Sequence, residues 1–226
     1  MIRVTLSGGE LDGFEIEQPA ASVRLLVPEP NSAELVIPEW DGNEFRLGDG
    51  SRPIIRTFTP RAIGPDGLDI DIVIHDGGVA SGWAEAEDPG AEVAISGPGR
   101  GYEIDHSATG MILVGDETAI SAIGQLIEHM PESIAVEVHL VVADDFGQVE
   151  IPDHANTSIT WHKLLPTDEM GTTMVEALSA AEFDGSTAIW CAGEAAAMHR
   201  IRTFLFKQIG VPRSQATVRG YYKARD

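Results

Sequence analysis

Residues 56–61 read Arg-Thr-Phe-Thr-Pro-Arg and bring together a cation, an aromatic ring and a hydroxyl. Alternate side chains of an extended strand share a face, so Arg56 and Phe58 are expected to point the same way, with Thr59 at the end of the strand. Such a set can bind an anion and cover a planar ring. Taken alone, the segment also fits a surface cation beside a core phenylalanine.

Short strands surround this segment in the first half of the chain. β-Branched, alternating stretches bounded by Gly and Pro predict strands over residues 2–6, 22–27, 34–37, 54–59, 68–75 and 91–96. The clearest is 68–75, Leu-Asp-Ile-Asp-Ile-Val-Ile-His, whose leucine and isoleucines fall on one face. Many short strands separated by turns predict a small antiparallel barrel over residues 1–106.

One segment of the first half interrupts the strands. Gly77 and Gly78 permit an unusual backbone, and residues 80–87 predict a short helix closed by Pro89 and Gly90. Small residues at the start of a helix leave unpaired N–H groups open to a phosphate. This turn is therefore a second candidate for anion binding.

The second half of the chain, after a predicted domain boundary at 107–110, has a different pattern of secondary structure. Apolar strands are predicted at 111–114, 135–143, 158–164, 186–193 and 217–222, and helices at 117–130, 170–180 and 195–210. This alternation predicts a parallel sheet covered on both faces over residues 110–226.

Ligands of such sheets bind outside the carboxyl ends of the strands, where residues 115–119 (Gly-Asp-Glu-Thr-Ala) and 190–194 (Trp-Cys-Ala-Gly-Glu) stand out. Thr118 and Glu194 also fit an ordinary role at a helix start. No G-x-G-x-x-G fingerprint is present.

Composition narrows the classes of partner. Fifteen Lys and Arg against 36 Asp and Glu give the 226 residues a formal charge of -21, which disfavours nucleic acid and anionic membranes. One cysteine, Cys191, excludes an internal disulfide and cannot alone hold an iron–sulfur cluster. The scattered histidines predict no metal site, and no nucleophile elbow is apparent. With no long apolar run or signal-like start, we expect a cytoplasmic protein without membrane insertion. We also expect the protein to be a monomer.

The ordered motifs resemble those of the siderophore-interacting protein family, FAD-dependent ferric-siderophore reductases of the ferredoxin-reductase type. Residues 56–61 correspond to R-x-[YF]-T-P-R, and residues 75–84 to a histidine followed by G-P-A-S-x-W-A. Residues 115–119 and 190–194 correspond to G-D-E-T-A and W-x-A-G-E. Phe58 stands where tyrosine is usual, Val79 where proline is usual, and Tyr222 where tryptophan is usual.

The resemblance implies a two-domain β plus α/β fold, an antiparallel FAD-binding β-barrel followed by a parallel-sheet NAD(P)H-binding domain. It implies that NAD(P)H reduces FAD, which passes electrons to an Fe(III)-siderophore and releases Fe(II), with no catalytic acid or base. Lys223 and Arg61 are implied contacts of the anionic siderophore. The implied cofactor-binding residues are Arg56, Phe58, Thr59, His75, Gly78, Ala80, Ser81, Gly115, Asp116, Thr118, Trp190, Ala192, Gly193 and Glu194.

The electron donor and acceptor leave alternatives open. Asp144 and Asp145 follow the second strand of the α/β half and disfavour a 2'-phosphate there, which favours NADH over NADPH. A general NAD(P)H:flavin oxidoreductase with another acceptor, or a flavin-binding module that does not turn over, would carry the same motifs.

Overall fold

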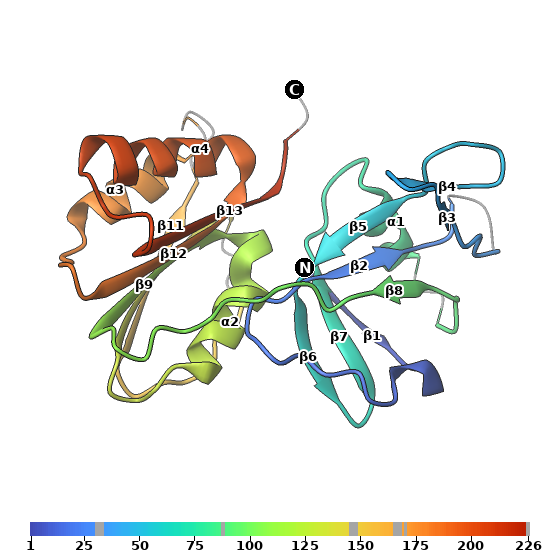
Figure 1. Ribbon diagram of the computed structural model, residues 1–226, viewed down its shortest axis with the longest axis horizontal. Coiled ribbons are helices and arrows are strands. Elements are labelled where there is room, and N and C mark those ends of the chain that lie inside the picture. The colour runs from blue at the N-terminus through green and yellow to red at the C-terminus, as the bar shows by residue number, and fades with distance from the viewer. Residues whose placement is uncertain (30–33, 87–88, 145–148, 165–168, 170, 225–226) are drawn as a thin grey trace. The chain divides into compact units, whose positions relative to one another are not determined.

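The computed structural model describes residues 1–29, 34–86, 89–144, 149–164, 169 and 171–224. The chain divides into two compact units, Met1–Tyr102 and Glu103–Asp226 (Figure 1). Each unit has a hydrophobic core of its own. Among the described residues, no helix combines the length and apolar character that crossing a membrane requires.

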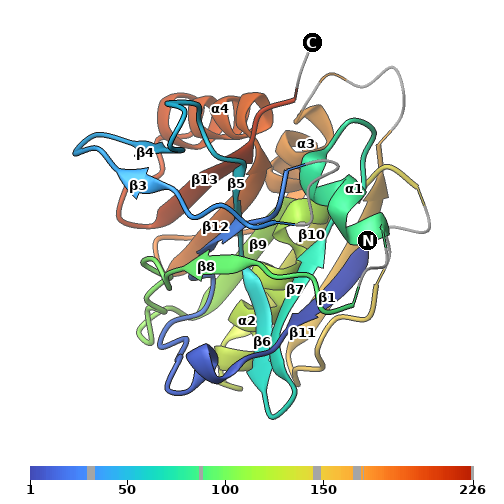
Figure 2. The ribbon, with the colours of Figure 1, turned by 90° about the vertical axis from the view of Figure 1, so that its right-hand side faces the viewer.

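The first unit is built from antiparallel strands, as the sequence predicts. One sheet has the order β1-β7-β6 and a second the order β5-β2-β8, while β3 and β4 form a hairpin (Figure 2). The bounds are β1 (Ile2–Leu6), β2 (Val23–Leu26), β3 (Glu39–Trp40), β4 (Phe45–Arg46), β5 (Ile55–Phe58), β6 (Pro60–Gly64), β7 (Gly67–Ile72) and β8 (Ala94–Ser96). A 3-10 turn, Gly9–Leu11, follows β1, and helix α1 (Val79–Glu85) follows β7.

The two three-stranded sheets of this unit share one core. Its centre contains Val23 from β2 and the β7 side chains Leu68, Ile70 and Ile72, each at most 1% exposed. The strict alternation of 68–72 therefore sorts its faces as predicted. On the outer face, Asp71 accepts two bonds from the guanidinium of Arg3, at 2.7 and 2.9 Å, across the β1–β7 pair.

Several strand predictions in this unit need correction. The predicted strand 68–75 ends at Ile72, and the predicted strand 91–96 begins at Ala94. Residues 34–37 form no strand, and Val36 and Ile37 are 52% and 63% exposed, so the segment's apolar character does not reflect burial. The predicted strand 54–59 ends at Phe58, because Thr59 leads the chain from β5 in one sheet to β6 in the other. Pro60 fits the first position of β6, where a missing N–H is tolerated.

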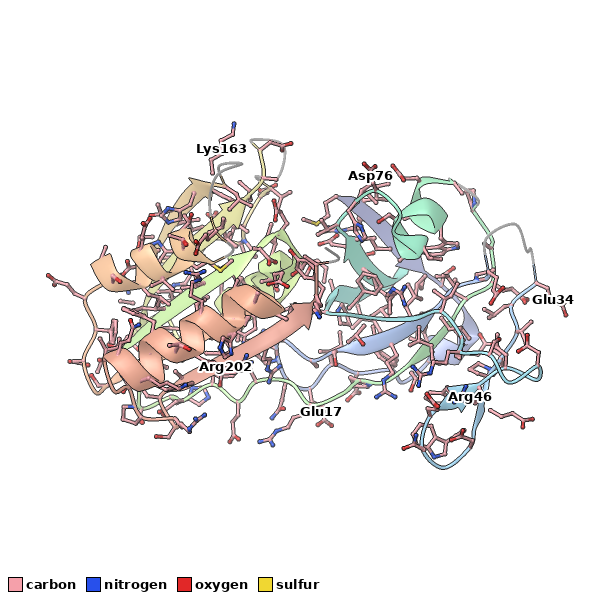
Figure 3. All side chains as sticks on the ribbon, turned by 90° about the horizontal axis from the view of Figure 1, so that it is seen from above. Glu17, Glu34, Arg46, Asp76, Lys163 and Arg202 are labelled. Carbon is pink, nitrogen blue, oxygen red and sulfur yellow. The ribbon has the colours of Figure 1, made fainter. Side chains whose placement is uncertain are left out.

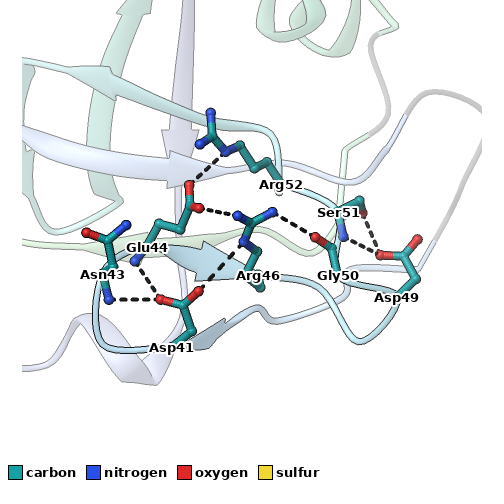
Figure 4. A network of polar contacts seen from close by, with 8 residues as sticks. All are labelled: Asp41, Asn43, Glu44, Arg46, Asp49, Gly50, Ser51 and Arg52. Atoms are coloured by element: carbon teal, nitrogen blue, oxygen red, sulfur yellow. Dashed lines mark hydrogen bonds and ion pairs between the residues drawn. The ribbon is translucent and has the colours of Figure 1, made fainter.

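The β3–β4 hairpin is held by short-range polar contacts (Figure 4). The Asp41 carboxylate accepts hydrogen bonds from the Asn43 and Glu44 amides, both at 2.8 Å. Glu44 also pairs with Arg46 and with Arg52, whose Nε lies 2.7 Å from its carboxylate. Glu44 thus pairs with one arginine of the hairpin, Arg46, and with one that follows the hairpin, Arg52.

The second unit is a five-stranded parallel sheet of order β11-β10-β9-β12-β13. The strands are β9 (Gly110–Asp116), β10 (Ala135–Val142), β11 (Thr157–Lys163), β12 (Thr187–Glu194) and β13 (Ala216–Tyr222). The helical segments are η2 (Glu117–Ala119), α2 (Ile120–His129), α3 (Thr172–Ala180), α4 (Ala195–Thr203) and a π-helical turn, η4 (Phe204–Gln208).

Helices cover both faces of this sheet, as predicted for a parallel sheet. Figure 1 shows α3 and α4 on one face and α2 on the other. Side chains of alternate strand positions, such as Val114, Val141 and Cys191, pack under α3 and α4. The predicted helix 195–210 is shorter than expected, because α4 ends at Thr203 and gives way to the π-helical turn.

Candidate functional site

In the first unit, strand β5 presents Arg56 and Phe58 on the same face of its sheet. The β2–β5 register sets Arg56 opposite Leu25 and Phe58 opposite Val23, and directly opposed residues share a face. Phe58 is half-buried and packs against the core, so only part of its ring is available to contact a ligand.

Arg56 is exposed, and its Nη1 donates to the Ile55 carbonyl at 3.0 Å. Among the described residues its guanidinium forms no ion pair, although the chain carries 36 acidic residues. A guanidinium without an ion-pair partner of this sort can bind an anion through charge-assisted hydrogen bonds. Thr59 is buried where the chain leaves β5, and Arg61 is half-buried in β6.

The turn from β7 into α1 is closed by His75 and Ser81. The Ser81 hydroxyl accepts from the His75 amide at 3.2 Å and donates to the Val73 carbonyl at 3.4 Å. Gly78 is required here, because a Cβ on it would lie 2.6 Å from the Ser81 oxygen and 2.7 Å from the His75 ring. The structure thus engages the Ser81 hydroxyl in holding the turn.

Among the residues that the structure describes, no side chain caps the first turn of α1. Gly78 occupies the N-cap position and supplies no side-chain bond to the helix, and the first helical bond runs from Gly82 N–H to the Gly78 carbonyl. The amides of Ala80 and Ser81 precede that bond and have no partner within the helix. These amides, rather than the serine hydroxyl, are the part of the turn suited to an anion.

In the second unit, Asp116 joins the two predicted motifs at the carboxyl edge of the sheet. Its Oδ1 accepts from the Thr118 amide at 3.0 Å and from the Thr118 hydroxyl at 2.5 Å. Its Oδ2 accepts from the Glu194 amide at 2.8 Å. Burial raises the pKa of this carboxyl to about 6, against the opposing effect of its hydrogen bonds.

Gly193 makes the approach of Asp116 possible. Its φ is +152°, and a Cβ built on it would lie 2.4 Å from Asp116 Oδ2. Any side chain at this position would therefore occupy the space of the carboxylate as well as strain the backbone. The glycine of Trp-Cys-Ala-Gly-Glu and the aspartate of Gly-Asp-Glu-Thr-Ala form one structural unit.

Glu194 is 2% exposed and caps helix α4. Its Oε2 accepts from the amides of Ala196 and, at 3.0 Å, of Ala197. Its Oε1 accepts from the Ala224 amide at 3.2 Å, which fixes the chain after β13. The carboxylate is thus engaged in the helix-opening role that the sequence left open as an alternative.

Tyr222 joins this cluster and was not among the predicted site residues. Although Tyr222 is 43% exposed, partial burial of its phenol, followed by the nearby carboxylates of Asp116, Glu117 and Glu194, raises the pKa of that group. The signal in the sequence that could have marked Tyr222 as a site residue is its position, where the family resemblance leads us to expect tryptophan. Residues 116 and 222 are far apart in the chain, so local pattern could not reveal their proximity.

The remaining predicted residues of this unit are spread more widely. Trp190 and Ala192 are fully buried in β12, and Trp190 makes an edge-on contact with Tyr221 at a centroid distance of 6.3 Å. Gly115 precedes Asp116 in β9, and Lys223 is exposed after β13. Asp144 follows β10, whereas Asp145 lies outside the described residues.

The strand order places the Asp116 cluster at the switch point of the sheet. From β9 the chain adds β10 and β11 on one side and then β12 and β13 on the other. Ligands of open parallel sheets bind where the order reverses, outside the carboxyl ends of the strands. Asp116 ends β9 and Glu194 ends β12, so both stand at this point.

An antiparallel β unit followed by this sheet defines the fold of ferredoxin-reductase-like flavoproteins. A ferredoxin reductase in carbazole 1,9a-dioxygenase matches 91% of the chain, over 70% of its own length, with TM-score 0.61 and 15% identity, which shows the fold alone. The family models "Siderophore-interacting FAD-binding domain" and "Siderophore-interacting protein" match residues 1–102 and 108–225. The chain therefore belongs to the siderophore-interacting protein family.

Individual relatives agree with this assignment. The ferric vibriobactin reductase ViuB of Vibrio cholerae is 27% identical over 99% of this chain and 84% of its own length. A siderophore utilization protein from T. fusca is 31% identical, with TM-score 0.85 over 99% of this chain and 87% of its own. Fold and family together make the chain a siderophore-interacting protein with an FAD-binding domain.

Proposed function

We propose that this chain passes electrons from NAD(P)H through FAD to Fe(III) held by a siderophore and so releases Fe(II) for iron assimilation. The observation that carries the proposal is the exposed Arg56, which forms no ion pair with the described residues and lies on one sheet face with Phe58. The chain that carries it matches the family's FAD-binding domain. The similarity to ViuB, a ferric vibriobactin reductase, supports the acceptor class.

The first unit has residues that fit FAD. Arg56 would bind the pyrophosphate through charge-assisted bonds, and the uncapped amides of Ala80 and Ser81 would supply further donors. The ring of Phe58 would lie against the flavin, and His75, fixed over Gly78, would border it. Bound FAD supplies the conversion of a two-electron hydride donor into single electrons.

The overall electron balance needs no acid or base from the protein. One dihydronicotinamide gives up a hydride, which corresponds to two electrons and one proton, and two Fe(III) centres take one electron each. Fe(II) is held less tightly by hard anionic chelators and can leave. The protein's task is then to position donor and chelate and to hold the flavin.

Local cations would attract an anionic ferric siderophore to a chain whose average surface repels it. Lys223 is exposed after β13, and Arg61 lies half-buried in β6. In a protein of charge -21, such cations determine where an anion can approach. We propose Lys223 and Arg61 as contacts of the ferric siderophore. We also propose that the protein functions as a monomer.

NADH is the donor that we propose over NADPH. Asp144 is exposed two residues after the end of β10, and the Glu117 carboxylate of the neighbouring turn accepts a hydrogen bond from the Ala143 amide. Two carboxylates beside this strand end disfavour the dianionic 2'-phosphate.

Formation of Fe(II) tests the proposed function. FAD-loaded protein, NADH or NADPH, and a ferric siderophore are mixed without oxygen in the presence of a chromogenic Fe(II) chelator. We expect colour to form faster than with free FAD and the nicotinamide alone. Equal rates with and without protein would remove the reductase assignment.

A further inference from the structure

We infer that the carboxyl edge of the parallel sheet excludes the phosphates of the electron donor, and that Asp116, Glu117 and Glu194 determine this specificity. The inference rests on the proposed function and deepens it. On this account the donor is recognised through its reduced nicotinamide, while the adenosine diphosphate portion contributes little to binding.

The first βα turn is where an open parallel sheet ordinarily binds a dinucleotide pyrophosphate, on amides at the start of the helix. In this unit that turn contains Asp116, Glu117 and Thr118, between β9 and α2. The Thr118 amide already donates to Asp116 Oδ1 at 3.0 Å. The position of the phosphate acceptor is therefore filled by the protein's own carboxylate.

The second turn at the switch point repeats this arrangement. The amides of Ala196 and Ala197, at the start of α4, donate to Glu194 Oε2. The Glu194 amide itself donates to Asp116 Oδ2 at 2.8 Å. Both carboxylates are buried, with exposed fractions of 6% and 2%, so a phosphate could reach these amides only by displacing a buried group.

A third donor at the same edge is occupied as well. The Ala143 amide, directly after β10, donates to Glu117 Oε1. Carboxylates thus accept from one amide after β9 and one after β10, and from two amides after β12, at the ends of the three central strands.

Two described cations of this edge, Lys163 and Lys223, belong to the outer strands. Lys163 ends β11, and Figure 3 shows its side chain pointing outward, while Lys223 follows β13. A pyrophosphate at the centre would meet Asp116, Glu117 and Glu194 in place of these amines. Repulsion and the loss of existing bonds both act against it.

Two measurements on FAD-loaded protein test the inference. Calorimetric titration with ADP-ribose, which carries the pyrophosphate without nicotinamide, should show no binding at millimolar concentration. Flavin reduction by 1-benzyl-1,4-dihydronicotinamide, which has no phosphate, should have a KM within about threefold of that for NADH. Micromolar binding of ADP-ribose would overturn the inference. A KM for NADH more than about tenfold below that for 1-benzyl-1,4-dihydronicotinamide would also overturn it, since tenfold corresponds to about 1.4 kcal/mol of binding free energy.

Charge-removing variants attribute the effect to particular residues. Glu117→Gln should lower the KM for NADH by about threefold or more at low salt and reduce its dependence on ionic strength, because a screened repulsion has been removed. Glu182→Gln is the matched control, since Glu182 is exposed between α3 and β12, at the amino end of β12. An unchanged or higher KM in Glu117→Gln would contradict the assignment.

Failure of the proposed function gives a different result. If neither donor reduces the flavin, the reductase proposal falls, while the ADP-ribose titration, which needs no turnover, still decides whether the sheet edge accepts a pyrophosphate.

Discussion

Asp116 Oδ2 lies 2.8 Å from the Glu194 amide nitrogen, and this bond joins the ends of β9 and β12 across 78 positions of sequence. It connects the first βα turn to the start of α4 at the switch point of the sheet. Both residues are buried, so this contact links the ends of the two strands away from solvent.

Gly193→Ala should destabilise the protein. Its added Cβ would meet Asp116 Oδ2 at 2.4 Å, and φ is +152°. We expect the free energy of unfolding to fall by about 2–4 kcal/mol from combined overpacking and backbone strain. Urea unfolding followed by circular dichroism measures it. Gly185→Ala is the control, because a Cβ there meets nothing within 4 Å and the loss should stay near zero.

Asp116 should make stability depend on pH. Its pKa is raised from 3.8 to about 6 in the folded chain, so the native state keeps a proton that the unfolded chain loses between those values. The stabilisation is complete below about pH 4 and is lost as pH rises through about 6, a change of about 3 kcal/mol at most.

Unfolding of wild type and Asp116→Asn across this pH range isolates the contribution of Asp116. The asparagine variant carries a constant cost, because it lacks one acceptor oxygen, but no titration at this position. The difference in unfolding free energy should therefore shift in favour of wild type toward low pH. A difference that stays flat would show that Asp116 titrates normally.

Arg56→Ala should weaken FAD retention. The loss of a charge-assisted phosphate contact is expected to cost roughly 1.5–3 kcal/mol, or about 10- to 150-fold in Kd. Fluorescence titration of apoprotein with FAD measures it. Arg24→Ala provides the matched control, since Arg24 lies on the adjacent strand opposite Thr57, on the other face of the sheet. Equal effects of the two substitutions would show that only net charge matters.

Phe58→Tyr should strengthen FAD binding. The added phenol restores a hydrogen-bonding group that the family usually has, worth about 0.5–1.5 kcal/mol. The ring is half-buried against the core, so the tyrosine must direct its hydroxyl outward. Fluorescence titration of the apoprotein with FAD measures the change in Kd. Weaker FAD binding than in wild type would show that residue 58 contributes to the core alone.

The sequence predicts those parts of the fold that rest on local pattern. Alternation in 68–72 places Leu68, Ile70 and Ile72 in the core of the first unit, where they lie. Apolar strands alternating with helices likewise predict the parallel sheet of the second unit. The segment 34–37 shows the limit of this approach, because it forms no strand and two of its apolar side chains, Val36 and Ile37, are exposed in the structure.

Long-range contacts decide the rest. The motif residues 115–119 and 190–194 are visible as separate signals, but their union through Asp116 depends on the strand order, which local periodicity does not determine. The same holds for the Glu117 contact with Ala143 and for Tyr222 beside the cluster. The passage of the chain from β5 to β6 at Thr59 also follows from packing between sheets.

Anaerobic absorbance of the flavin tests the central claim most directly. FAD-loaded protein should be yellow, lose its colour on addition of NADH, and regain it when a ferric siderophore is added, faster than in buffer alone. Protein that takes up no FAD would contradict the flavin assignment. Bleached protein whose colour returns no faster with the ferric siderophore than without it would contradict its role as a siderophore reductase.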